Sequence, residues 1–112
     1  MQPTAREEIP QGTLDLLILK TLDRLGELHG FQIANAIQAC SQDVLQVEEG
    51  SLYLALQRML LKDWLSAEWG KTPENRRARY YQLTREGRKQ LARELTRYGR
   101  VSEAIGRVLE PA

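Results

Sequence analysis

The sequence predicts a mainly α-helical domain that carries one small β-hairpin and ends in a long helix. Apolar residues recur at helical spacing in three stretches between residues 13 and 62. Two strand-like runs follow, at residues 65–69 and 77–83, and the loop between them contains glycine, proline and asparagine. Helical spacing returns at Thr84 and continues almost to the end of the chain. With 112 residues, one small domain with a modest core is expected.

The first helix is expected over residues 13–25. Its apolar positions are Leu14, Leu17, Ile18 and Leu22, with Leu16 and Leu25 beside them. Thr13 can cap the helix through its hydroxyl, and the negative charge of Asp15 favours the positive end of the helix dipole. Gly26 and Gly30 then break the helical pattern.

The second helix is expected over residues 31–42, followed by a turn and a short extended piece at residues 44–47. Its buried positions are expected to be Phe31, Ile33 or Ala34, Ile37 and Cys40. Cys40 is interpreted as a small buried hydrophobe, with an oxidation switch as the minority alternative. A single cysteine forms no intrachain disulfide and agrees with a reducing compartment.

The third helix is expected to begin at Glu48 or Glu49 and to end at Leu61 or Lys62. Its buried stripe is expected to be Leu52, Leu56, Met59 and Leu60. The side chains expected on its open side are Ser51, Tyr53, Leu54, Gln57 and Arg58. Three helices, with a turn between the second and the third, form a helix-turn-helix pattern, and the hairpin that follows is the wing of a winged helix-turn-helix.

The wing carries a basic set made of Lys71, Arg76, Arg77 and Arg79. Strand alternation places Arg77 and Arg79 on one side and Arg76 on the other, so these cations do not all face the same phosphates. For Arg79 the alternative is a structural role beside Tyr81, with its charge paired to a carboxylate. The aromatic residues expected to fill the core or stabilise the hairpin are Trp64, Trp69, Tyr80 and Tyr81.

Charge is divided unevenly along the chain. Residues 71–100 contain ten Lys or Arg and three Asp or Glu, whereas the rest contains six basic and twelve acidic residues. This division indicates that one part of the fold faces a polyanion. The alternative for the basic residues from Arg85 onward is an ordinary exposed helix with charged pairs.

The last helix repeats apolar residues over about five turns. The stripe is Leu91, Leu95, Tyr98, Val101, Ile105 and Val108. It is longer than a three-helix core can cover, so a second copy of the chain is expected to cover it in a homodimer. The predicted organisation is therefore a winged helix-turn-helix domain over residues 9–84 and a C-terminal dimerisation helix over residues 85–110.

Several classes of protein and site are not supported by the sequence. There is no apolar run long enough to span a bilayer and no signal-peptide pattern, so a soluble cytoplasmic protein is expected. His29 lacks companions at ligand spacing, so no metal is expected. No cofactor-binding motif and no catalytic set are present, so an enzyme is not expected.

Five short motifs occur in a fixed order along the chain. They are residues 11–19 (QGTLDLLIL), 28–31 (LHGF), 50–53 (GSLY), 67–70 (AEWG) and 79–84 (RYYQLT), the last followed by Gly87. Together they resemble the PadR family of bacterial transcriptional regulators, in its shorter-tailed branch, over residues 9–108. Two departures stand out: Leu54 occupies a position that is usually proline in the family, and Asp63 one that is usually glycine.

The resemblance implies a dimeric repressor that binds a palindromic operator in double-stranded DNA and releases it in response to a small-molecule effector or another signal. By resemblance, Ser51 and Tyr53 are the first residues of the third helix to meet DNA. The alternatives are that Ser51 only caps the helix and that Tyr53 packs against the wing. Arg58 is interpreted as a phosphate clamp or a surface ion-pair partner.

A winged-helix module that binds another protein is the alternative function. In that case the third helix packs on a partner instead of in a DNA groove. Leu54 and the acidic pair Glu48 and Glu49 favour it, and the arginine-rich wing argues against it.

Overall fold

The computed structural model of the protein describes residues 6–10 and 12–111. Gln11, the first residue of the first motif, lies outside the described residues. The elements follow in the order β1 (Glu7–Glu8), α1 (Leu14–Leu25), β2 (Leu28–His29), α2 (Gly30–Cys40), β3 (Leu45–Gln46), α3 (Glu49–Leu61), β4 (Leu65–Lys71), β5 (Arg77–Leu83) and α4 (Arg85–Leu109).

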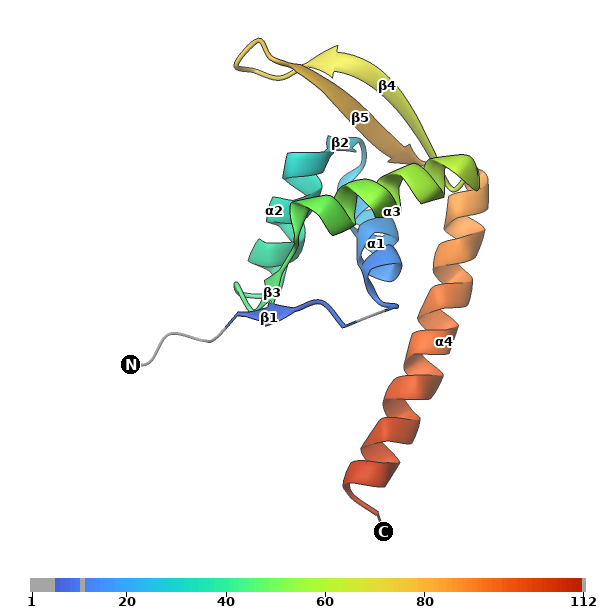
Figure 1. The fold of residues 1–112 in the computed structure, drawn as a ribbon. Coiled ribbons are helices and arrows are strands. Elements are labelled where there is room, and N and C mark those ends of the chain that lie inside the picture. The colour runs from blue at the N-terminus through green and yellow to red at the C-terminus, as the bar shows by residue number, and fades with distance from the viewer. Residues whose placement is uncertain (1–5, 11, 112) are drawn as a thin grey trace.

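The first three helices form the body of the domain, the hairpin rises above one end of it, and α4 leaves the base of the hairpin as a long rod (Figure 1). Strands β4 and β5 pair antiparallel, and β2 joins the free edge of β5, which gives the sheet order β2-β5-β4. The arrangement is that of a winged helix-turn-helix with a long C-terminal helix, as predicted.

The core lies between the three helices and the base of the hairpin. Its fully buried side chains are Ile18, Leu19, Ile33, Leu56 and Met59. Leu65 and Leu83 close it from the hairpin, and Leu91 closes it from the first turns of α4. The rest of α4 extends beyond this core.

Two details of α1 differ from the prediction. Thr13 precedes the helix, but its hydroxyl donates to the carbonyl oxygen of Pro10 at 2.6 Å and makes no capping hydrogen bond. The deeply buried leucines include Leu16 and Leu19, whereas Leu14 and Leu17 are half-buried at the edge of the core. The helix therefore presents a broader buried face than the predicted stripe.

The predicted buried face of α2 was wrong at both ends. Ile33 and Ile37 are buried as expected, but Phe31 is 72% exposed and Cys40 is exposed. The helix begins one residue earlier, because the Nδ1 atom of His29 accepts from the backbone N–H of Gln32 and the Gln32 side chain accepts from the backbone N–H of His29. This reciprocal cap directs Phe31 outward in the first turn.

Helix α3 has the predicted bounds and buries Leu52, Leu56 and Met59, together with Ala55. Leu60, which was expected in the buried stripe, is half-buried. Two strand pairings were not predicted: β1 pairs with β3 in parallel, and β2 pairs with β5. The pairing of β1 with β3 brings the N-terminal segment close to the start of α3.

The junction between the hairpin and the last helix confirms two predictions. The hydroxyl of Thr84 accepts from the backbone N–H of Gly87 at 3.0 Å, which caps α4. Asp63, where glycine is usual in the resembling family, has a φ of 60° after the end of α3. Gly87 packs so tightly that an added Cβ atom would lie 2.0 Å from the carbonyl oxygen of Trp64.

Within the described part of the chain, no helix has both the length and the apolar character needed to cross a membrane.

Candidate nucleic-acid interface

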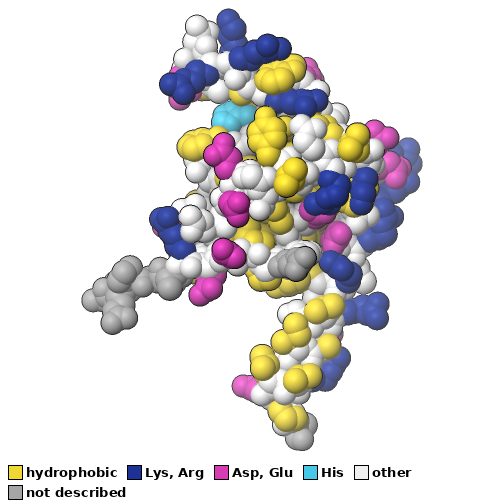
Figure 2. Space-filling view, in the orientation of Figure 1, with side chains coloured by type: hydrophobic (Ala, Val, Ile, Leu, Met, Phe, Trp, Pro, Cys, Tyr) yellow, Lys and Arg dark blue, Asp and Glu magenta, His cyan; other side chains and the backbone are white. Residues whose placement is uncertain are grey.

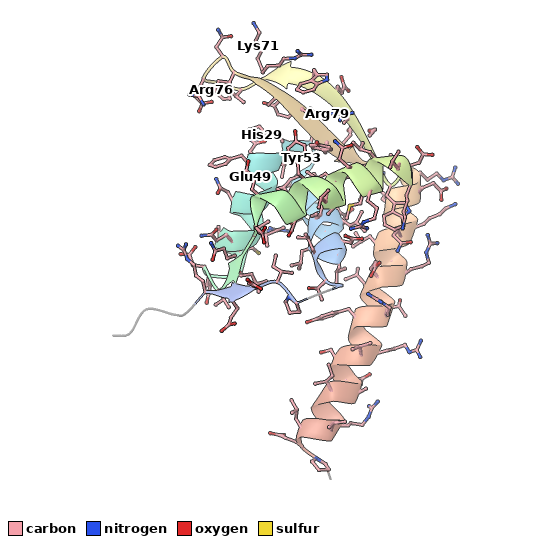
Figure 3. All side chains as sticks on the ribbon, viewed as in Figure 1. His29, Glu49, Tyr53, Lys71, Arg76 and Arg79 are labelled. Atoms are coloured by element: carbon pink, nitrogen blue, oxygen red, sulfur yellow. The ribbon has the colours of Figure 1, made fainter. Side chains whose placement is uncertain are left out.

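One face of α3 is open to solvent beside the hairpin. Its buried residues pack toward α1 and α2, so the opposite side of the helix points outward. All five side chains predicted for the open side are exposed: Ser51, Tyr53, Leu54, Gln57 and Arg58. Tyr53 lies on the side of α3 that faces the hairpin (Figure 3) and is 54% exposed, so it is not a core residue.

Arg58 is held by an ion pair. Its Nη2 atom donates to Oδ1 of Asp15 at 2.8 Å, and its Nη1 atom donates to the other carboxylate oxygen. The hydrogen bond to Asp15 raises the pKa of the Arg58 guanidinium, against the smaller effect of burial. Of the two interpretations of Arg58, the structure shows the ion pair. The sequence identified Asp15 only as a helix-dipole residue, because its partner is 43 positions away.

The basic residues of the hairpin lie at its tip and along one side. Lys71 and Arg77 face each other as the last pair of the β4–β5 ladder, and Arg76 lies in the turn beyond them. These three side chains are exposed. Figure 3 shows Lys71 and Arg76 at the far end of the hairpin and Arg79 closer to the body of the domain.

Trp69 organises two of these arginines. The guanidinium carbon of Arg77 lies 4.3 Å from the centre of the Trp69 ring, and that of Arg79 lies 5.9 Å from it. Arg77 and Arg79 therefore share one side of the hairpin, as predicted. Trp69 is 57% exposed, so of its two predicted roles it has that of stabilising the hairpin.

The other hairpin aromatics are structural. Tyr81 is buried, and burial raises the pKa of its hydroxyl, while the neighbouring Arg79 lowers it by a smaller amount. The hydroxyl of Tyr80 donates to the backbone carbonyl of Lys71 at 3.2 Å. Arg79 lies beside Tyr81 as its structural interpretation expected, but the ion pairs found among the described residues do not include it.

Positive charge on the surface is concentrated in two areas. Figure 2 shows Lys and Arg side chains gathered over the hairpin and again where the body meets the upper part of α4, with apolar and acidic side chains on the surface between them. The lower part of α4 presents an apolar stripe in the same view. One side of the molecule therefore combines a basic hairpin with a helix whose outer face has little positive charge.

The apolar stripe of α4 lies almost entirely outside the core. Its exposed members are Leu95, Tyr98, Val101, Ile105 and Val108. Leu91, predicted as a sixth member of a dimer contact, is only 5% exposed and belongs to the core of its own chain, so that assignment is corrected. A groove of about 480 Å³ separates the middle of α4 from the start of α1, and Tyr98, Val101 and Ile105 line it.

The sequence comparison points to one protein family, and the structure comparison points to a matching fold. The sequence profile of the transcriptional regulator PadR-like family matches residues 18–93. An uncharacterised protein of Lysinibacillus sphaericus is 28% identical over 108 residues, which cover 94% of this chain and 95% of that protein.

Two solved structures show the same fold. A transcriptional regulator from Clostridium thermocellum superposes with a TM-score of 0.79 at 24% identity, covering 87% of this chain and 93% of that one. Bacillus subtilis PadR, solved in complex with operator DNA, superposes with a TM-score of 0.66 at 22% identity, covering 77% of this chain and 48% of that one.

Proposed function

Because the chain belongs to the PadR-like family of transcriptional regulators, we propose that it is a dimeric repressor that binds a palindromic operator in double-stranded DNA. The observation that carries the proposal is the exposed face of α3 beside a hairpin tipped with basic residues. A helix fits the width of the major groove, and cations on a hairpin can hold the flanking phosphates. The complex of Bacillus subtilis PadR with operator DNA supports this use of the fold.

In the proposed complex, α3 enters the major groove and the wing holds the DNA backbone. Ser51, Tyr53, Leu54 and Gln57 face the base edges, because they lie on the open side of the helix. Lys71, Arg76 and Arg77 contact phosphates. Arg79 has a supporting role, since its guanidinium lies near the Trp69 ring and Tyr81. Arg58 is removed from the proposed contacts because Asp15 holds it.

The dimer is proposed to form through α4, with residues 9–84 as the DNA-binding domain and residues 85–110 as the dimerisation helix. Five large apolar side chains of α4 are exposed, from Leu95 to Val108. Burying one such side chain contributes about 1.5–3 kcal/mol to the free energy of association. A partner that covers even half of the stripe would therefore stabilise the dimer by several kcal/mol. A twofold dimer would present two copies of α3 to successive turns of DNA.

Release of the operator is proposed to depend on a small-molecule effector. The groove beside Tyr98 adjoins the proposed dimer face and has a volume of about 480 Å³. A ligand bound there would change how α4 sits against α1, and thereby the spacing between the two α3 helices of a dimer.

A second candidate function is docking of a protein partner on α3. Two observations favour it: Leu54 and Leu61 are 74% and 86% exposed, and the acidic pair Glu48 and Glu49 lies at the start of the same helix. The basic wing favours DNA over this alternative.

The test is a gel-shift titration of the intact protein against the DNA upstream of its own gene, repeated across salt concentrations. We expect binding whose affinity falls steeply with salt, because the wing displaces counterions from phosphates. Failure to bind duplex DNA even at low salt would exclude the proposal and leave the protein-docking alternative.

A further inference from the structure

The outer face of α3 has no cation that is free of an ion pair. Helix α3 is fully described from Glu49 to Leu61, and its only basic residue is Arg58. The guanidinium of Arg58 donates both of its hydrogen bonds to Asp15 on α1. The bidentate contact to guanine that arginine commonly makes is therefore not available from this helix.

Leu54 lies in the middle of that outer face. It projects away from the buried residues Leu52 and Leu56, and its side chain is 74% exposed. Gly50, one turn earlier on the same side, has no side chain, and a carboxylate oxygen of Glu48 lies 3.7 Å from where a Cβ atom would lie. Leu54 also lies in the N-terminal half of α3, the part of a recognition helix that reaches base edges.

Major-groove edges of base pairs present hydrogen-bonding groups and one apolar group, the C5-methyl of thymine. A leucine side chain forms no hydrogen bond, so it gains contact only with that methyl group. Placed over another base it would leave donors or acceptors without partners. A leucine held against base edges in the major groove would therefore favour thymine.

We infer that Leu54 reads the C5-methyl group of a thymine in each half of the DNA site, so that the site has a thymine at a fixed position. This inference rests on the proposed DNA-binding function. The basic wing on the same side of the molecule is complementary to phosphates, so it would bring the outer face of α3 against duplex DNA. Tyr53 and Gln57, which are also exposed on this helix, would supply the polar contacts on neighbouring bases.

The experiment begins with duplexes selected from a random pool by the intact protein. Each thymine of the selected site is then replaced singly by deoxyuridine, which removes the methyl group and keeps the base-pairing edge. We expect one thymine in each half-site at which the replacement weakens binding about fourfold, the value of burying one methyl group. With Leu54→Ala the same replacement should have almost no effect.

Leu61→Ala is the matched control, because Leu61 is also an exposed leucine, 86% against 74% for Leu54, and lies at the C-terminal end of the same helix. It should retain the fourfold sensitivity at that thymine. Thermal melting of Leu54→Ala should match that of the parent protein, since the side chain is outside the core.

The possible failures are distinguishable. Selected duplexes whose binding is unaffected by deoxyuridine at every thymine, or affected equally in the parent protein and in Leu54→Ala, would overturn the inference and leave the proposed function in place. If no duplex is selected at low salt, the proposed function fails and the inference fails with it.

Discussion

The guanidinium of Arg58 on α3 donates to both carboxylate oxygens of Asp15 in the first turn of α1. This pair joins the proposed recognition helix to the helix on which α4 packs. Asp15 also lies at the positive end of the α1 dipole, so both the helix dipole and the Arg58 guanidinium stabilise its negative charge. An arginine engaged in this way is not free to neutralise a phosphate.

This difference between Arg58 and the wing gives the first prediction. Replacing Lys71 or Arg77 by alanine should weaken binding to all DNA sequences alike and lower the slope of log K against log salt by about one unit for each change. Arg58→Ala should leave the slope close to that of the parent protein, because its charge is already paired. Fluorescence anisotropy across salt concentrations measures all three variants. Equal losses of slope in Arg58→Ala and Arg77→Ala would show that Arg58 contacts phosphate.

The second prediction concerns Tyr53. Its side chain is half exposed on the open side of α3, so Tyr53→Ala should leave the melting temperature nearly unchanged. The same change should cost about 1–3 kcal/mol of affinity for a specific DNA site, the usual value of a base contact. Thermal melting and DNA titration of this one variant distinguish a DNA-contact role of Tyr53 from a role in the core. A loss of about 3 kcal/mol or more in folding stability would instead mark Tyr53 as a core residue.

The third prediction tests the apolar stripe of α4. Leu95→Glu combined with Ile105→Glu should yield monomers with weakened DNA binding, because both side chains are exposed in the single chain and are proposed to be buried by a partner. Ala92→Glu with Thr96→Glu adds the same two charges to the polar side of the helix and should leave a dimer. Sedimentation velocity separates the two results. An unmodified chain that remains monomeric at high micromolar concentration would refute the proposed dimer.

The fourth prediction compares two glycines of α4. Gly87→Ala should lower the free energy of unfolding by about 1–3 kcal/mol or more, because its Cβ atom would overlap the backbone carbonyl of Trp64. Gly99→Ala meets no atom within 4 Å and should raise the free energy of unfolding by about 0.5–1 kcal/mol through helix propensity. Urea denaturation measures both. An unchanged free energy of unfolding in Gly87→Ala would mean that α4 does not pack closely against the backbone at Trp64.

Local signals in the sequence were sufficient for much of this fold. The cap at Thr84, the wing strands and the bounds of α3 each depend on residues that lie close together in the chain. Asp63 could likewise be expected to take a left-handed conformation from its place after a helix end. These features were therefore predictable without tertiary information.

Other features depend on contacts between distant residues. The two-residue strands β1 and β2 are too short to show alternation, and they exist because of their partners in β3 and β5. Phe31 and Cys40 fit an apolar face by spacing alone, but α2 is rotated so that Ile33 and Ile37 point inward. Similar reasoning applies to the candidate site, where the sequence could not show that Trp69 lies against Arg77 or that Asp15 holds Arg58.

The central claim, sequence-specific binding of duplex DNA, is tested most directly by competition. The protein is bound to labelled DNA from upstream of its own gene at physiological salt and challenged with unlabelled duplexes of the same or of scrambled sequence. We expect the scrambled duplex to compete at least about 10³-fold less well, the lower end of the range for specific DNA-binding proteins. Equal competition by the two duplexes would contradict sequence-specific binding.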